Sequence, residues 1–537
     1  MKGVILLSIQ GNYPDPAFEI ERLLLFGLRN GLVEQADIIY TRNLLLDLLK
    51  INAPWPGSNN NELMTIPETA TPILHHLLDY CVDIHLLSHD TLTNRELMDT
   101  RIMGLLMPRP SEILRRFISL KREQSIQTAT DWFYTICQKS DYIRVNQIAR
   151  NIRWLSSSMY GELEITINLS KPEKDPKEIA ASKNAPAVGY PKCLLCVDNM
   201  GYQGRLNHPA RQTLRVLPVT LLGEPWYFQY SPYVYYHQHC IVLNQNHIPM
   251  KISKDTFERL FDFIDQFPHY FIGSNADLPI VGGSILNHDH FQGGVYSFPM
   301  EKAPIQFSLH CNQTSGIKAG IVAWPLSTLR LSSHSRDKLV ILADHILELW
   351  RTYSDPSVEI LAYSPDQTPH NTITPIVRKN ENAEYEIDLV FRNNRTSKEH
   401  PMGIFHPHAE LFHIKKENIG LIEVMGLFIL PGRLEKELSD ISNLLTHQID
   451  VKEIVTSGET HPLFKHLPWI KTLINEYGDT HSQKEAETIL HDAVAKICIK
   501  VLEHAGVFKD NSTGRIAFIR FLTLSGLEAK CDQEPLI

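Results

Sequence analysis

The feature that most restricts the possible folds is a change in the spacing of apolar residues along the chain. Apolar side chains recur at helical spacing in residues 20–28 and 43–49, whereas residues 162–169 alternate polar and apolar as a half-buried strand does. Helical spacing returns after Pro431 and Gly432, and between these regions lie strand-like segments, among them 227–230, 234–236 and 240–243. We therefore expect an α+β chain whose strand-rich middle carries helical regions at both ends.

At 537 residues the chain is too long for a single core, so we expect several packed parts. Each half of the middle has an apolar strand, a helix near 254–267 or 335–353, and then a His-x-His pair. Two diverged copies of one unit with antiparallel sheets would give this order, and chance is the alternative. The expected parts are a mainly helical N-terminal extension, a first half, a second half and a C-terminal helical region with a helix at 485–504, over residues 1–180, 181–300, 301–431 and 432–537.

Composition and charge exclude several classes of protein. The net charge is −9, so we expect no nucleic-acid partner, although a local basic cleft for a phosphorylated ligand is compatible with it. No run of 18 apolar residues occurs, and the apolar start ends at Ser8, too early for a secretory leader. Eight cysteines are too sparse for a disulfide scaffold. We expect a cytoplasmic enzyme without a membrane partner.

The motif with the clearest chemistry lies between two glycine pairs, in GGSILNHDHFQGG at residues 282–294. If it is extended, His288, His290 and Gln292 share one face. A neutral imidazole can attack phosphorus, an amide can donate to a phosphate oxygen, and glycines let the backbone approach the phosphates. The alternatives are a polar strand edge or a purely structural metal site.

A Cys-x-x-Cys pair, Cys193 and Cys196, stands between Pro191 and a turn, which favours a metal knuckle over a redox motif. Tetrahedral zinc needs two further ligands, for which His247 and His288 are candidates. Inert thiols are the alternative. We expect a structural zinc ion and no organic cofactor.

Two further segments carry polar groups suited to ligands. A loop at 204–212 holds Arg205, Asn207 and Arg211, whose guanidinium groups match phosphate oxygens, with a solvated basic loop as the alternative. By strand alternation His406, His408 and Glu410 share a face and could hold a divalent metal. Glu410 replaces the amide donor of the first copy, so this copy is expected to be degenerate, with a structural or substrate-binding role.

These motifs resemble the uridylyltransferase branch of the histidine-triad superfamily. HDHFQ at 288–292 is similar to its His-x-His-x-Gln signature. CLLC at 193–196, RLNHPARQ at 205–212, SNADLPIVGGSILNHDHFQGG at 274–294 and FHPHAELFHIKKENIGLIEVMG at 405–426 resemble the second class of galactose-1-phosphate uridylyltransferases. The resemblance continues in MGLLMPRPSEILRRF at 103–117 and YGELEITINLSKPEKDPK at 160–177.

The resemblance implies a reaction in which UDP-glucose and galactose 1-phosphate give glucose 1-phosphate and UDP-galactose. It implies a fold of two histidine-triad-like halves, with UDP-sugars and hexose 1-phosphates as partners. Separately, we expect a homodimer. The rival activities are a histidine-triad hydrolase or phosphorylase, with water or phosphate as acceptor, and a catalytically silent sugar-nucleotide sensor.

Site residues follow from the same resemblance. The nucleophile maps to His290 and its companion amide to Gln292, with His288 as the first histidine of the signature. The family's first class has Pro and Gly where this chain has Asp289 and Phe291. A zinc site maps to Cys193, Cys196, His247 and His288, and a second metal site to His370, His406 and His408. The expected substrate-binding residues are Arg205, Asn207, Arg211, Asn275, Ser284 and Glu423.

Overall fold

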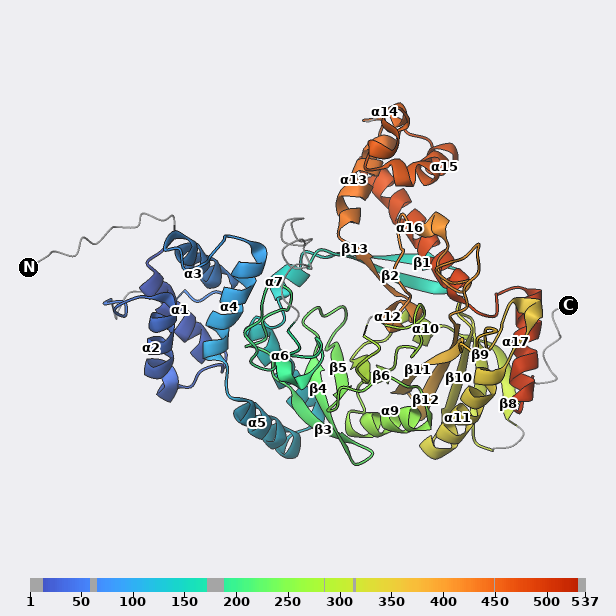
Figure 1. Cartoon of the computed structure of the whole chain (residues 1–537), viewed down its shortest axis with the longest axis horizontal. Helices are drawn as coiled ribbons and strands as arrows, with labels where there is room; N and C mark the ends of the chain where they lie inside the picture. The colour runs from blue at the N-terminus through green and yellow to red at the C-terminus, as the bar shows by residue number, and fades with distance from the viewer. Residues whose placement is uncertain are drawn as a thin grey trace, which may run out of the picture. The chain divides into compact units, whose positions relative to one another are not determined.

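The computed structural model describes residues 13–57, 65–170, 188–283, 285–311, 315–448 and 450–529 (Figure 1). The chain forms two compact units. The first comprises Met1–Arg150, Pro172–Val219 and Pro225–Val234, and the second comprises Asn151–Lys171, Thr220–Glu224 and Tyr235–Ile537. The division expected at residues 180, 300 and 431 stays a prediction.

The first unit is mainly helical, as the apolar spacing predicts. Its first helix begins at Pro16, where the side chain of Asp15 accepts the backbone N–H of Ala17 at 2.8 Å. The apolar stripe of this helix, including Ile20 and Leu23, is buried. The helices are α1 (Pro16–Arg29), η1 (Gln35–Asp37), α2 (Ile38–Leu49), α3 (Thr71–Asp83), α4 (Leu92–Leu106), α5 (Pro110–Glu123), α6 (Ile126–Lys139), α7 (Val145–Ile148) and η3 (Val197–Asn199).

Two neighbouring strands, β3 (Leu217–Leu221) and β4 (Glu224–Tyr230), follow the loop that contains the Cys-x-x-Cys pair. The Tyr230 hydroxyl donates to the Thr130 carbonyl at 2.9 Å, and the Tyr142 hydroxyl donates to the Tyr230 carbonyl at 3.0 Å. These buried hydrogen bonds attach β4 to α6 within the first unit.

The second unit is organised by an antiparallel sheet in the order β14-β8-β9-β10-β12-β11-β6-β7-β5. Its central strands are buried on both faces, and they pair in register from Asn371 opposite Asn393 to Lys379 opposite Tyr385. The bounds are β5 (Cys240–Asn244), β6 (Phe271–Gly273), β7 (His290–Gly294), β8 (Ile305–Cys311), β9 (Lys318–Val322), β10 (Thr328–Ser333), β11 (Asn371–Lys379), β12 (Tyr385–Asn393) and β14 (Leu527–Ala529).

A smaller sheet in the same unit has the order β1-β2-β13, with β1 (Ile152–Ser158) antiparallel and β13 (Leu427–Pro431) parallel to β2 (Gly161–Asn168). The alternation at 162–169 therefore predicted β2 correctly. This pairing joins a strand that precedes the Cys-x-x-Cys loop to one near residue 430, which places β1 and β2 in the second unit.

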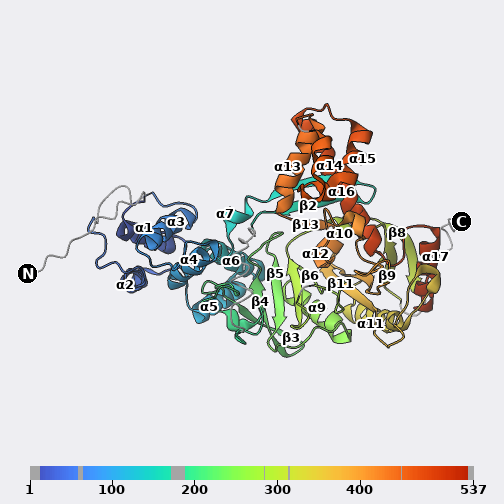
Figure 2. The same ribbon diagram turned by 45° about the horizontal axis from the view of Figure 1, so that its top comes forward.

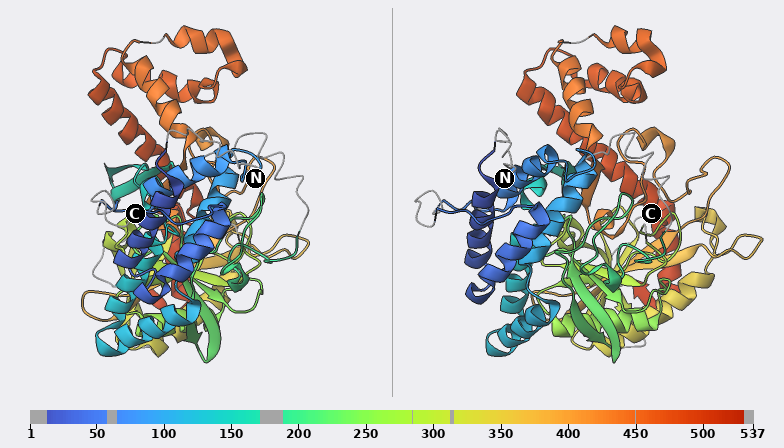
Figure 3. Two further views of the ribbon diagram at one scale, coloured as in Figure 1. Left: turned by 90° about the vertical axis from the view of Figure 1, so that its left-hand side faces the viewer. Right: turned by 60° about the vertical axis from the view of Figure 1, so that its left-hand side comes forward.

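Helices cover these sheets. α9 (Lys254–Gln266) and α11 (Arg336–Thr352), both predicted, contact each other and β11, and Figure 2 shows them on one side of the strands. The helices within residues 433–477, orange in Figure 3, gather at one end of this unit, whereas the helix at 512–524 contacts β14. The remaining helices are α10 (Pro299–Lys302), η4 (Pro356–Val358), η5 (Ala409–Leu411), α12 (Leu421–Val424), α13 (Arg433–Leu445), α14 (Val451–Ser457), η6 (Gly458–Thr460), η7 (Phe464–His466), α15 (Leu467–Tyr477), α16 (Gln483–Ala505) and α17 (Ser512–Leu524).

The fold class is α+β with antiparallel sheets, as predicted, but three local features differ. Residues 234–236 form no strand, since Val234 has a φ of +33° in a turn and Tyr236 is a buried ring. Residues 405–408 also form no strand, and η5 follows them. In the C-terminal region β14 pairs with β8, and its three residues are too few to show an alternation. Across the described residues, no helix combines the length and apolar character needed to span a membrane.

Candidate active site

Strand β7 presents His290 and Gln292 on one face. It pairs antiparallel with β5, placing His290 opposite Leu243 and Gln292 opposite Ile241. Residues two apart on a strand point to the same side, so the two polar side chains lie together as the sequence predicts. His288 precedes the strand and is not part of it.

The two glycines that end β7 are required by close packing. A Cβ on Gly293 would lie 2.6 Å from the Phe271 carbonyl oxygen, and one on Gly294 would lie 2.6 Å from the Tyr236 ring. Neither distance is compatible with a side chain. Glycine at these two positions allows the neighbouring backbone and the Tyr236 ring to pack closely against the strand.

The ring of His290 is held in one tautomer by a backbone carbonyl. Its Nδ1 lies 2.8 Å from the backbone carbonyl oxygen of His288, and because a carbonyl can only accept, Nδ1 carries the proton. The lone pair is then on Nε2. The residue is only 5% exposed, and burial lowers the pKa of His290 to about 4, so that the ring is neutral near pH 7. A neutral imidazole with a fixed tautomer can act as a nucleophile.

Gln292 is held by a residue that the sequence reasoning missed. The Nε2 atom of His239 lies 3.3 Å from the Gln292 Oε1 atom. His239 directly precedes β5, and by strand alternation it belongs to the same face as Ile241, opposite Gln292. The sequence alone shows that His239 lies two residues before Ile241 and so belongs to the same face of the strand. Only the register of β5 on β7 shows that this face meets Gln292.

His288 and His247 form a pair of imidazoles with ring centroids 4.9 Å apart. The Nε2 of His288 donates to the backbone carbonyl of Asn244 at 2.8 Å, which leaves Nδ1 as the nitrogen with the lone pair. A hydrogen bond from one ring nitrogen to a carbonyl is the usual way in which proteins orient a metal-ligating histidine.

The Cys193 and Cys196 sulfur atoms lie 3.5 Å apart, and burial raises the pKa of Cys196 to about 11. Cys193 and Cys196 belong to the first unit, and His247 and His288 belong to the second, so a zinc ion held by all four stays a prediction. Two thiolates and two imidazoles are a donor set that suits zinc, and metal binding would offset the raised thiol pKa.

The basic loop is tied down by its own contacts. The Arg205 guanidinium donates to the Asn207 Oδ1 at 2.7 Å and to the Tyr202 hydroxyl at 2.6 Å, and Arg211 donates to the Ala210 carbonyl at 3.2 Å. Phosphate binding by Arg205, Asn207 and Arg211 stays a prediction.

Two other predicted substrate-binding residues meet at the start of α12. The Asn275 Oδ1 accepts the Leu421 N–H at 2.9 Å, and the Glu423 Oε1 accepts from the buried Lys415 ammonium at 2.8 Å. Both side chains therefore support this short helix, and their roles toward substrate stay predictions. Ser284 lies outside the described residues.

The second predicted metal site is only partly brought together. The His370 Nδ1 lies 2.7 Å from Asn394 Oδ1 and its Nε2 lies 2.6 Å from Ser364 Oγ, so both nitrogens have polar partners. The His406 Nδ1 donates to the Pro407 carbonyl at 3.0 Å. A metal held by His370, His406 and His408 stays a prediction.

His408 instead lies in a group with Glu410 and His504 that could hold a metal ion, with ligand atoms within 4.8 Å of one another. The shared face expected for His406, His408 and Glu410 is wrong, because residues 409–411 form a 3-10 helix rather than continuing a strand. His504, at the end of α16, was not anticipated, since nearly a hundred residues separate it from His408.

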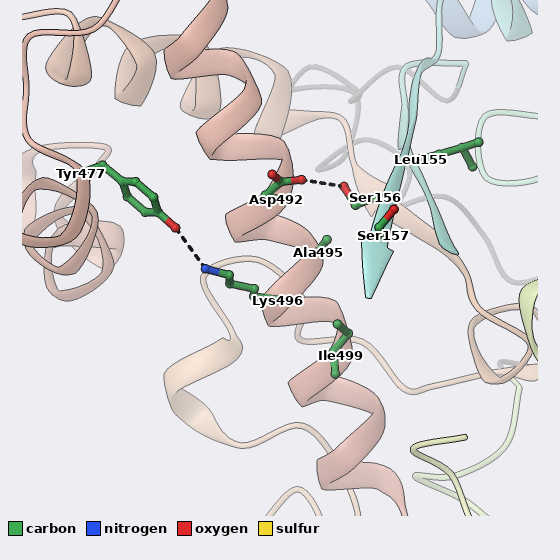
Figure 4. A pocket seen from close by; sticks show the side chains of 8 residues that line it. All are labelled: Leu155, Ser156, Ser157, Tyr477, Asp492, Ala495, Lys496 and Ile499. Atoms are coloured by element: carbon green, nitrogen blue, oxygen red, sulfur yellow. Dashed lines mark hydrogen bonds between the residues drawn. The ribbon is translucent and has the colours of Figure 1, made fainter. Parts of the chain in front are cut away.

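A separate pocket of about 420 Å³ lies between β1 and α16 (Figure 4). The Lys496 ammonium donates to the Tyr477 hydroxyl at 3.0 Å, and the Ser156 hydroxyl donates to Asp492 at 3.5 Å. Its polar groups thus pair with one another, and no residue predicted to be functional is among its lining residues, which are Leu155, Ser156, Ser157, Tyr477, Asp492, Ala495, Lys496 and Ile499.

Comparisons with known proteins agree with the motifs. Models described as the N-terminal and C-terminal domains of galactose-1-phosphate uridyl transferase match residues 32–249 and 262–454. The galactose-1-phosphate uridylyltransferase of Caldanaerobacter subterraneus subsp. tengcongensis is 56% identical, over 96% of this chain and 99% of that protein. Those of Clostridium acetobutylicum and Bacillus subtilis are 50% and 47% identical over 94% of this chain, and over 99% and 97% of their own lengths. A solved structure, yeast Ap4A phosphorylase Apa2, is 12% identical with a TM-score of 0.30 over 62% of this chain and 90% of that chain, too low to carry an argument.

Proposed function

The chain belongs to the galactose-1-phosphate uridylyltransferase family, and on this premise we propose that it transfers UMP from UDP-glucose to galactose 1-phosphate through a covalent intermediate on His290. The products are glucose 1-phosphate and UDP-galactose, so the reaction belongs to galactose metabolism. The substrates are sugar nucleotides and hexose phosphates. The observation that carries the residue assignment is the hydrogen bond from His290 Nδ1 to the His288 carbonyl, which directs Nε2 away from the backbone.

Two displacements at phosphorus account for the transfer. In the first, the His290 Nε2 lone pair forms a bond to the α-phosphorus of UDP-glucose, and the bond from that phosphorus to the glucose 1-phosphate oxygen breaks. In the second, a phosphate oxygen of galactose 1-phosphate bonds to the phosphorus, and the P–N bond returns its electron pair to Nε2. The Nδ1–H bond to the His288 carbonyl stabilises the ring as it gains positive charge.

Gln292 stabilises the negative charge on the non-bridging phosphoryl oxygens. Its side chain lies on the same face of β7 as His290, and an amide N–H donates to a non-bridging oxygen. Both displacements pass through similar geometry at phosphorus, so one donor serves both. Because a sugar phosphate is exchanged for a similar one, the overall reaction is reversible.

The zinc site is proposed to be structural. All four positions around the ion would be protein ligands, Cys193, Cys196, His247 and His288, which leaves none for water or substrate. His288 lies two residues before His290, so holding its ring also holds the carbonyl that orients the nucleophile. When bound, zinc would stabilise the fold and fix the position of the residues that begin β7.

The remaining assignments follow from the family and the sequence. Arg205, Asn207, Arg211, Asn275, Ser284 and Glu423 are proposed to contact substrate. The sparse cysteines and the metabolic reaction support a cytoplasmic location, and a homodimer is the proposed assembly.

The deciding experiment uses UDP-glucose labelled at the α-phosphate. Wild-type protein mixed with it, without an acceptor, should become labelled at His290 and release one glucose 1-phosphate for each site. Adding galactose 1-phosphate should then discharge the label as UDP-galactose. Steady release of UMP without a sugar phosphate would indicate a hydrolase, and no labelling at any metal loading would indicate a sensor.

A further inference from the structure

His239 is a buried histidine that the two displacements do not use. It is 3% exposed, and burial lowers the pKa of His239 to about 4, so the ring is neutral near pH 7. The one polar contact of its ring among the described residues joins Nε2 to the Gln292 Oε1 at 3.3 Å, while Nδ1 is buried without a hydrogen-bond partner. A buried histidine with one polar partner on a reacting side chain indicates a dedicated interaction.

The tautomer of His239 decides which end of the Gln292 amide faces the substrate. A neutral imidazole has one N–H, and a proton on Nδ1 would leave a buried donor without an acceptor. With the proton on Nε2, the ring donates to Oε1 and only a lone pair is left unpaired. The oxygen of Gln292 is then occupied, and its two N–H groups are the part left to meet a phosphate.

The ring of His239 has little freedom to move. Tyr236 lies against it with ring centroids 4.5 Å apart, and the Tyr236 hydroxyl donates to the Gly293 carbonyl at 3.3 Å. The Tyr236 ring in turn occupies the space that a Cβ on Gly294 would need. Gly294 therefore leaves room for Tyr236, whose ring packs against His239 beside the strand that carries Gln292.

We propose that His239 is a positioning residue that holds the Gln292 amide with its N–H groups toward the transferred phosphoryl group, a role that rests on the proposed uridylyl transfer. An amide turned the other way would present its oxygen to phosphate oxygens and repel them. His239 acts through Gln292 and does not touch the substrate.

The test is a double-mutant cycle between His239 and Gln292. His239→Phe keeps a flat ring against Tyr236 but removes the donor, and should slow single-turnover labelling by α-labelled UDP-glucose by about tenfold, within the roughly hundredfold loss expected for removing the Gln292 donor itself. In the Gln292→Ala background the same substitution should change the rate less than about twofold, because the group on which it acts is gone. The Kd for UDP-glucose should be unchanged.

A conservative variant separates positioning from folding. His239→Gln places an amide N–H where Nε2 lies and should recover most of the labelling rate, whatever its effect on thermal stability. Equal rate losses in both backgrounds, or a His239→Phe rate within about twofold of wild type, would overturn the proposal. If wild-type protein is not labelled at all, the uridylyl transfer itself fails, and that outcome is visible before any His239 variant is compared.

Discussion

Replacing Glu423 separates a structural role from the substrate-binding role that the sequence suggests. The Lys415 side chain is 4% exposed, and its ammonium donates to the Glu423 Oε1 at 2.8 Å and to the Ile429 carbonyl at 3.2 Å. Burial, the largest single effect, opposes the charged form of Lys415, but the attraction and hydrogen bond to Glu423, together with attraction to Glu417, raise the pKa of Lys415. Glu423→Gln would leave this buried ammonium without its nearest counter-charge.

The expected cost follows from that geometry. Removing one partner of a buried ion pair costs about 3–5 kcal/mol of unfolding free energy, and Gln keeps an acceptor for Lys415, which favours the lower end, ~3 kcal/mol. The double variant Lys415→Met/Glu423→Leu removes both charges and mainly loses the bond from the Gly420 N–H to Glu423 at 3.3 Å, a capping contact that contributes about 1 kcal/mol. It should therefore be more stable than Glu423→Gln.

Urea unfolding monitored by tryptophan fluorescence measures these differences, and the KM for UDP-glucose is measured on the same samples. Glu417→Gln is the matched control, because Glu417 lies 3.8 Å from the same ammonium but its side chain is 57% exposed, so we expect a change below ~0.5 kcal/mol. An unchanged urea midpoint for Glu423→Gln together with a raised KM would refute the structural reasoning and assign Glu423 to the substrate.

Four further results are expected. His290→Asn should bind UDP-glucose but form no labelled enzyme, and substantial turnover would remove His290 as the nucleophile. Gln292→Ala should slow labelling and its discharge alike, by roughly two orders of magnitude in stopped single turnovers, and rates within twofold of wild type would show that its amide points elsewhere. Cys193→Ser should lower zinc content, thermal midpoint and activity together, whereas a fully active and stable variant without metal would exclude the site. Burial lowers the pKa of His413 to about 4. As the pH falls below about 6.5, the unfolded chain binds a proton at this histidine before the folded chain does, which favours unfolding. The urea midpoint should therefore drop between about pH 6.5 and 4, and a flat profile would contradict this.

Local periodicity predicted the elements that depend on neighbours in the chain. The alternation at 162–169 predicted β2, and the apolar stripes predicted α9 and α11. In a half-buried strand or helix, the apolar residues recur with the period of that element, so the pattern is visible in the sequence. The same reasoning placed His290 and Gln292 on one face of β7, because side chains two residues apart in a strand point to the same side. It failed at His406 and His408, where the chain turns into η5 and an alternation has no strand to describe.

Sequence motifs predicted more of the candidate site than periodicity did. The spacing of Cys193 and Cys196 predicted a metal knuckle, and similarity to known uridylyltransferases indicated His247 and His288 as the other two ligands. The sequence by itself therefore determined the family and predicted which strand reacts and which residues bind metal, because each of these depends on which residues are present and how closely they follow one another.

Tertiary structure alone decided which distant residues act on these groups. The register of β5 on β7 brings His239 to Gln292, the end of α16 brings His504 to His408, and β14 pairs with β8 at the edge of the sheet. Such contacts join segments tens to hundreds of residues apart, and the free energy that selects them comes from packing and buried hydrogen bonds that no stretch of sequence contains on its own.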